Sequence, residues 1–84
     1  MMKVVKFGGS SLADAGQIQK AAAIIKAEAD RRYVVPSAPG KRFKDDIKVT
    51  DMLYQCYALA EKGEAFATQL AAIKDRYVSI LNGL

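Results

Sequence analysis

The sequence predicts an α/β fold in which two strands flank a helix and two more helices follow. A valine-rich run at residues 3–7 ends at two glycines, and Tyr33-Val34-Val35 forms a second strand-like run. Between and after these runs, apolar residues recur at steps of three or four, the spacing of one helical face. Two strands joined by a crossover helix form a βαβ unit, which pairs its strands in parallel with a right-handed connection. The predicted order is strand, helix, strand, helix, helix.

Size and composition limit the chain to one small, marginally stable unit. A chain of 84 residues buries only roughly 60–65% of the surface that its unfolded form exposes. No apolar run approaches the roughly 18 residues that a membrane span requires, and the first residues lack the apolar stretch of a secretory signal. A single cysteine, Cys56, cannot form an internal disulfide, which fits a reducing compartment. We therefore expect a cytoplasmic protein with no membrane partner.

The charge pattern favours a small anionic partner. The net charge is +4, and the obvious basic cluster is Lys41-Arg42-Phe43-Lys44. Asp45-Asp46 follow it at once, and the other basic residues are spread along helical faces. This distribution favours a solvated surface or a phosphate-binding loop over a nucleic-acid footprint, so we expect no nucleic-acid partner.

The first helix is predicted from Leu12 to about Arg31. Ser11 followed by Asp14 three residues later matches the acidic form of a capping box, so Ser11 is expected to accept from the free backbone N–H groups of the helix start. The apolar face that this helix lays on a sheet comprises Leu12, Ala15, Ile18, Ala22, Ile25 and Ala29.

The segments after the second strand are a loop and two helices. Pro36 removes a backbone donor, so the strand should end there or leave that position unpaired. A loop spans residues 36–48, the next helix runs from Thr50 to Gly63, and the last covers about residues 64–81. The residues expected to point inward are Leu53, Cys56, Tyr57 and Ala60 in the first of these helices, and Phe66, Leu70, Ile73, Tyr77 and Leu81 in the second.

The segment Lys6-Phe7-Gly8-Gly9-Ser10-Ser11 has the features of a phosphate-binding loop. It places a cation at a strand end, then glycines that let backbone N–H groups approach an anion, then hydroxyls at a helix start. Two commoner nucleotide motifs fail: the glycines lack the G-x-G-x-x-G spacing, and Gly40-Lys41 lacks the other residues of a P-loop. The alternative is a tight turn in which the glycines serve geometry, Ser11 is a cap and Lys6 is an ordinary surface residue.

Further segments occur in a characteristic order: Val34-Val35-Pro36-Ser37-Ala38-Pro39-Gly40-Lys41, Val49-Thr50-Asp51-Met52-Leu53 and Gly63-Glu64-Ala65-Phe66. Together with the opening motif, they resemble the start of aspartate kinases, in the amino acid kinase superfamily, over essentially the whole chain. Ser10 stands where a threonine is frequent, and Pro36 where a β-branched residue is usual. Residues 42–48 look longer than the loop in some relatives, so the register at Thr50 depends on the Thr-Asp match.

The resemblance implies a fold, an activity and a set of site residues. The fold would be the amino-terminal β-α-β-α-α portion of an amino-acid-kinase-like three-layer αβα sandwich with a mainly parallel sheet. The activity would be ATP-dependent transfer of phosphate to the side-chain carboxylate of L-aspartate, with Mg²⁺, in the biosynthesis of lysine, threonine and methionine. Lys6 would be catalytic. The ATP phosphates would be bound by Lys6, Phe7, Gly8, Gly9 and Ser10, and aspartate by Ser37 and Thr50.

The resemblance also implies that residues 1–84 are the amino-terminal part of a catalytic domain. It places the adenine pocket, the magnesium ligands, further aspartate ligands and the regulatory domains after Leu84, so the isolated chain is expected to be inactive. Two alternatives remain: another member of the superfamily, or a non-catalytic fragment that self-associates through unpaired sheet edges and apolar helix faces. For the site residues, Ser37 could instead satisfy backbone groups after the strand, and Thr50 could cap its helix.

Overall fold

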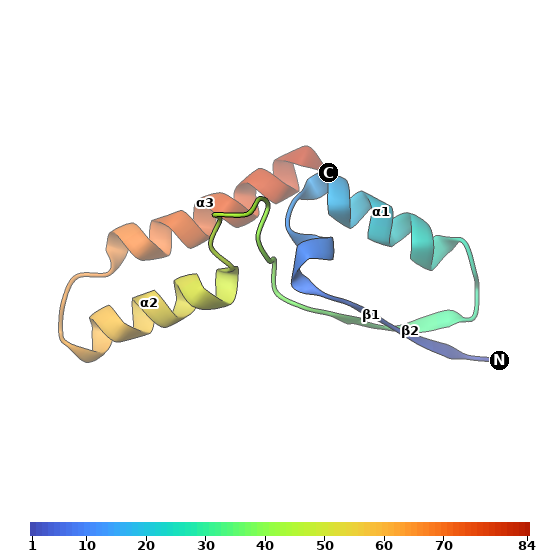
Figure 1. Ribbon diagram of the computed structural model, residues 1–84, viewed down its shortest axis with the longest axis horizontal. Helices are drawn as coiled ribbons and strands as arrows, with labels where there is room; N and C mark the ends of the chain where they lie inside the picture. Colours follow the sequence, from blue (N-terminus) through green and yellow to red (C-terminus); the bar gives the residue numbers. More distant parts are fainter.

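The structure, a computed structural model, describes all of residues 1–84 and confirms the predicted α/β class (Figure 1). Its elements are β1 (Lys3–Phe7), a short 3₁₀ helix η1 (Gly9–Leu12), α1 (Ala15–Lys26), β2 (Arg31–Pro36), α2 (Val49–Glu61) and α3 (Ala67–Gly83). β1 and β2 form a two-stranded parallel sheet. α1 lies over one face of this sheet. α3 forms a helical hairpin with α2, and its carboxyl end lies beside the amino-terminal end of α1 (Figure 1).

The two strands end together, and Pro36 ends the second as expected. Phe7 and Pro36 are the last aligned pair of the ladder. The next backbone N–H, that of Ser37, donates to the carbonyl oxygen of Phe7 at 3.0 Å. β2 begins at Arg31, earlier than the predicted strand, because the chain leaves α1 at Lys26 and turns back within four residues. Both strands therefore lead into loops at one end of the sheet.

The predicted cap of the first helix is wrong by three residues. Ser11 belongs to η1, where its backbone N–H donates to the carbonyl oxygen of Gly8 at 3.1 Å. Asp14 is the cap instead, since it is extended (φ −148°) and its side chain accepts from the N–H of Gln17 at 2.9 Å. The extra 3₁₀ turn after the glycines delays the α-helix to Ala15. An N-cap must be extended, a conformation that Asp14 has and a residue inside a 3₁₀ turn does not.

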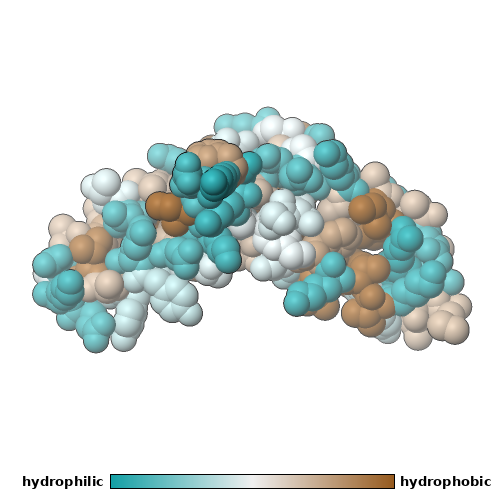
Figure 2. All heavy atoms as spheres, viewed as in Figure 1, coloured by the Kyte–Doolittle hydropathy of each residue, from teal (hydrophilic) through white to brown (hydrophobic).

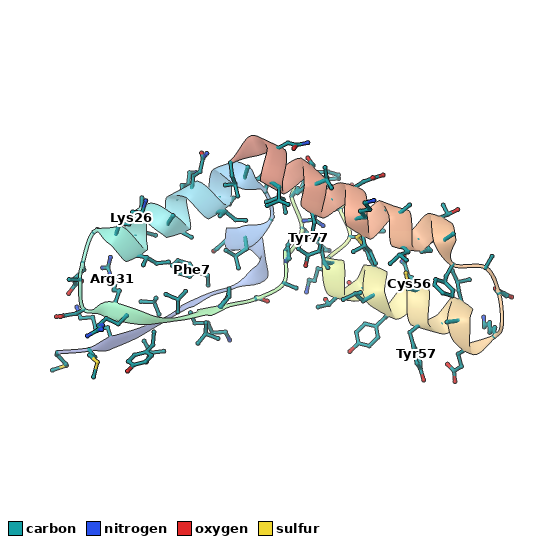
Figure 3. All side chains as sticks on the ribbon, turned by 180° about the vertical axis from the view of Figure 1, so that it is seen from behind. Phe7, Lys26, Arg31, Cys56, Tyr57 and Tyr77 are labelled. Atoms are coloured by element: carbon teal, nitrogen blue, oxygen red, sulfur yellow. The ribbon has the colours of Figure 1, made fainter.

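The inward face of α2 is also different from the predicted one. Val49 is buried, and Met52, Cys56 and Leu59 are half-buried. Leu53 and Tyr57, expected inside, are 50% and 64% exposed. Figure 3 shows Tyr57 pointing away from α3 and Cys56 lying on the side that faces it. The inward face differs because α2 packs against α3, and the sequence of α2 alone does not show which side α3 covers. Its end is as predicted, because Gly63 has the positive φ of +72° that stops a helix.

The buried stripe of α3 is centred on a charged residue. Its buried side chains are Ile73, Arg76 and Ile80. Of the predicted stripe only Ile73 is buried, whereas the other four residues are each at least 42% exposed; they are Phe66, Leu70, Tyr77 and Leu81. The helix turns Arg76 inward because backbone carbonyl groups of the neighbouring loops meet there and need donors. The end of α3 lies beside α1, where Gln19 Nε2 donates to the carbonyl oxygen of Gly83 at 3.4 Å.

The core is small for the length of the chain. Only 9 of 84 residues are buried, and the molecule is elongated, at 51 × 24 × 21 Å. The sheet face away from α1 carries Val4, Tyr33 and Val35, which are 69%, 55% and 51% exposed. Figure 2 shows apolar side chains reaching the surface in both halves of the molecule. None of the helices combines the length and apolarity that crossing a bilayer would take.

Candidate functional site

A pocket of about 410 Å³ opens where the loops after both strands meet the start of α2. Loops that follow the carboxyl ends of parallel strands are the usual location of ligand sites in α/β folds. We call this site the anion pocket, for the charge of its walls. Its lining residues are Gly9, Ser10, Ser37, Ala38, Pro39, Gly40, Lys41, Lys48 and Thr50.

Two glycines form the contact between the loops at the base of the pocket. The N–H of Gly40 donates to the carbonyl oxygen of Gly9 at 2.7 Å. A Cβ atom on Gly40 would lie 2.5 Å from the carbonyl carbon of Gly9 and 2.7 Å from the backbone nitrogen of Ser10. Such contacts are far shorter than real Cβ atoms make, so only glycine fits at position 40. From the sequence, Gly40 was recognisable only as part of the segment Val34–Lys41 that resembles the family, and this close contact with Gly9 could not be predicted.

The start of α2 presents unused backbone donors to the pocket. The N–H of Val49 is taken by the carbonyl oxygen of Pro39 at 3.0 Å, but those of Thr50 and Asp51 are not used by any backbone carbonyl. Lys48 is the N-cap and its side chain makes no capping bond. Thr50 is the second residue of the helix, so the alternative that it caps α2 is wrong, while its proposed contact with aspartate stays a prediction. Its hydroxyl and the free N–H groups are available to an anion at this helix terminus.

The charged residues that line the pocket are both cationic. Lys41 and Lys48 are exposed and line the walls, and no Asp or Glu is among the lining residues. Lys41 belongs to the basic cluster that was expected to be either a solvated surface or a phosphate-binding loop. Lys48 was missed, because its position in the pocket wall depends on the placement of α2. The pocket therefore suits a ligand with phosphate or carboxylate groups.

The structure brings together part of the predicted site. Gly9, Ser10, Ser37 and Thr50 all line the anion pocket, whereas Lys6, Phe7 and Gly8 do not. Phe7 lies beneath α1, in a separate hollow that Ala21 and Ile24 also line, and Figure 3 shows its ring between the sheet and that helix. Lys6 is exposed at the end of β1, and side-chain alternation puts it on the opposite face of the strand from Phe7.

One buried arginine links the segments that carry the pocket. The Arg76 side chain donates from Nη1 to the carbonyl oxygen of Ile47 at 2.8 Å and from Nη2 to that of Ala13 at 3.1 Å. Nη2 also donates to the carbonyl oxygen of Gly40. Arg76 is only 4% exposed, and this burial lowers the pKa of its guanidinium. Helical periodicity gave no signal for it, since charged residues normally face solvent.

Asp46 supplies the counter-charge beside this arginine. Its carboxylate accepts from Arg42 Nε at 2.6 Å, from Arg42 Nη2 at 3.0 Å and from the backbone N–H of Arg42 at 2.9 Å. Arg76 Nη1 lies 3.8 Å from the same carboxylate. The Asp46 side chain is 8% exposed, and its hydrogen bonds with Arg42 hold its pKa well below the usual range. The loop before α2 is thus closed by a charge-assisted, two-point contact.

Asp46 should make the stability of the chain depend on acid pH. A carboxylate with a depressed pKa contributes stability that is fully present above its unfolded pKa, about 4, and lost as pH falls below it. We expect Asp46→Asn to lower the free energy of unfolding by about 1–2 kcal/mol at pH 7. The difference should shrink between pH 4 and pH 2 in urea titrations. Asp45→Asn, an exposed neighbour, is the control, and equal effects of the two changes would contradict this role.

The side chains present suit an anion and not a metal ion. No three His, Cys, Asp or Glu residues lie close enough together to hold a cation. The anion pocket instead offers two lysines, two hydroxyl-bearing serines and a glycine-lined base. This donor set fits the phosphate groups of a nucleotide and the carboxylates of a small acid.

Three comparisons place these residues among known proteins. A family model described as Amino acid kinase family matches residues 1–83. Aspartokinase 3 of Bacillus subtilis (strain 168) is 48% identical over 84 residues, a match that covers 99% of this chain and 18% of that protein. The crystal structure of Clostridium acetobutylicum aspartate kinase superposes with a TM-score of 0.92 at 48% identity, over 96% of this chain and 19% of that one.

The chain therefore spans about a fifth of the length of the relatives that it matches. Both relatives are aspartate kinases, and the superposition covers 96% of this chain. The resemblance drawn from the sequence is confirmed, and so is the α/β architecture that it implied. Since the family model covers all but the last residue, the chain belongs to the amino acid kinase family.

Proposed function

We propose that this chain forms one wall of the active site of an aspartate kinase, which transfers the γ-phosphate of ATP to the side-chain carboxylate of L-aspartate. The carboxylate oxygen attacks phosphorus, the bond from phosphorus to the bridging oxygen breaks, and ADP leaves with that electron pair. The observation that carries the proposal is the anion pocket, which Lys41, Lys48 and Thr50 line together with the loops that follow two parallel strands.

The roles proposed for individual residues follow from their places in the pocket. Gly9 and Ser10 line the side formed by the loop after β1 and would contact the phosphates. Ser37, in the loop after β2, and Thr50, at the start of α2, also line the pocket and would hold aspartate, and the N-cap position that competed for Thr50 is Lys48. The attacking carboxylate is ionised near neutral pH, so no general base is required. The site would contribute to catalysis by positioning the reactants and neutralising charge.

Lys6 has the catalytic role in this proposal, in contact with the transferring phosphate. Phe7 would support the loop by packing beneath α1, and Gly8 would contribute its backbone to the loop. Lys6 lies at the end of β1 next to the pocket loop but outside the pocket lining. Its long side chain can reach an anion that extends beyond the pocket, where it would neutralise charge that develops during transfer.

The remaining parts of the proposal concern the whole protein. Residues 1–84 would be the amino-terminal part of the catalytic domain, with the adenine pocket, the magnesium ligands and regulatory domains in other residues. The enzyme would act in lysine, threonine and methionine biosynthesis, in the cytoplasm, where the lone thiol of Cys56 stays reduced. Self-association is a second candidate property, favoured by the exposed apolar residues of the open sheet face. Sedimentation at rising concentration tests it.

A chimera tests the activity directly. This chain would replace the matched segment of Bacillus subtilis Aspartokinase 3, to which it is 48% identical. We expect aspartate-dependent ADP release from the chimera and none from the isolated 84-residue chain, because one wall alone cannot align two substrates. The parent kinase is the positive control. A folded chimera without activity would contradict the proposed function, and robust turnover by the isolated chain would contradict the division of the site.

A further inference from the structure

We propose that Arg76 is a positioning residue that fixes the distance between the two sides of the anion pocket, an inference that rests on the proposed function. Arg76 lies on α3 and is not among the residues that line the pocket. It therefore acts through the segments that it holds and touches neither substrate. Those segments are the ones that place the phosphate side and the aspartate side relative to each other.

The three carbonyl groups that Arg76 binds belong to three separate segments. Ala13 directly follows η1, the turn that carries Gly9 and Ser10. Gly40 is the base of the pocket. Ile47 comes just before the start of α2, where Lys48 and Thr50 project. One guanidinium thus joins the phosphate side, the base and the aspartate side.

The other links between these segments are few. Gly40 is bonded to Gly9, Ser37 to Phe7 and Val49 to Pro39, by one backbone hydrogen bond each. All three bonds are made by the loop between residues 36 and 48, which contains no helix or strand. Arg76 adds the contact to a helix and so connects the loop to the rigid part of the fold. Without it, the two sides could shift relative to each other while each kept its own structure.

The chemistry of this contact requires arginine. The guanidinium is planar and presents its donors in a fixed fork, so its two terminal nitrogens can serve three acceptors from different directions. The Nε atom has no partner, which leaves the terminal nitrogens to make all of the bonds. The charged groups near it are Asp46, at 3.8 Å, Arg42, which Asp46 neutralises, and Asp14, which lines the same hollow. Lysine would keep the positive charge but lacks the two terminal nitrogens that donate to separate acceptors.

The inference predicts a loss of turnover without a matching loss of substrate binding. A displacement of about 1 Å between reacting groups can lower a rate on the order of 100-fold. In the active chimera, we expect Arg76→Met to lower kcat on the order of 100-fold. The KM values for ATP and aspartate should change by less than about threefold, because binding of each substrate is largely kept. Each side of the pocket would still bind its own ligand, but the two would be misaligned.

The controls separate positioning from folding. Kinetics are measured at a temperature where circular dichroism shows the variant fully folded, so that kcat refers to folded molecules. Arg32→Met is the matched control, because the exposed Arg32 lies on β2 and outside the pocket. If Arg76→Met does not fold, Arg76→Lys becomes the test of the proposal. We expect this variant to lose about tenfold in kcat, because lysine lacks the forked donors of the guanidinium.

The outcomes are distinguishable from a failure of the proposed function. The unaltered chimera tests that function, and Arg76 is assessed only relative to it. A kcat per folded molecule equal to that of the unaltered chimera, in Arg76→Met or in Arg76→Lys, would overturn the inference. So would an increase in KM that accounts for the whole loss of kcat/KM, because it would show a damaged binding site and not a misaligned one.

Discussion

Replacing Gly40 with alanine is expected to destabilise the isolated chain by about 3 kcal/mol, the upper range for one methyl group forced into a filled space. The new Cβ atom would lie 2.5 Å from the carbonyl carbon of Gly9 and 2.7 Å from the backbone nitrogen of Ser10. Both are backbone atoms, so no side chain can move aside. The loops must separate, which breaks the hydrogen bond from Gly40 to Gly9 and moves the carbonyl group that Arg76 binds.

Gly8 provides the matched control for this change. A Cβ atom on Gly8 would have no neighbour within 4 Å, and its φ of −73° is open to any residue. Gly8→Ala should therefore leave the chain as stable as before, or stabilise it by up to about 1 kcal/mol through the unfolded state. Urea denaturation followed by circular dichroism measures both variants. Equal stability of Gly40→Ala and Gly8→Ala would show that the two loops are not in contact.

Lys6→Ala is expected to lower kcat of the chimera by a factor on the order of 100 to 1000, the cost of removing one group that stabilises charge in a transition state. Thr50→Ala should act differently and mainly raise the KM for aspartate, because its hydroxyl is proposed to bind the ground state as well. Lys6 is exposed, so its truncation should cost little stability. Steady-state kinetics with either substrate varied separates the two patterns.

Lys74→Ala serves as the control, since Lys74 is exposed on α3 and lies outside the pocket. A Lys6 variant with the kinetics of the Lys74 variant would remove Lys6 from the mechanism. Lys41 and Lys48, the two cations that line the pocket, would then be the groups that neutralise the phosphate. Equal losses of folding in the Lys6 and Thr50 variants would instead favour structural roles for both positions.

The sequence predicted features that depend on the backbone of a single segment. Gly63 ends α2 through its positive φ, and Pro36 ends β2 because it has no N–H. The anchors of the family resemblance led to Gly9, Ser10, Ser37 and Thr50, which the structure gathers around one pocket. These patterns lie within short segments, so they can be recognised without knowing how the segments pack together.

The wrong predictions concern features that depend on how separate segments pack against each other. The inward face of α2 was assigned from periodicity alone, and Leu53 and Tyr57 are exposed because α3 covers a different side. Arg76 was missed because only the folded chain shows the carbonyl groups that it must satisfy. Gly40 was missed because its need for glycine comes from a loop about thirty residues away, at Gly9.

Pro36 also determines where another strand can join this sheet. Amide directions alternate along a strand, and the N–H of Ser37 points toward β1. The nitrogen of Pro36 therefore faces the outer edge of β2 and offers no donor there, at the end nearest the anion pocket. A neighbouring strand along β2 would lose one ladder bond at this position, whereas the outer edge of β1 carries no proline. Strand addition along β2 would therefore be weakest at the end nearest the pocket.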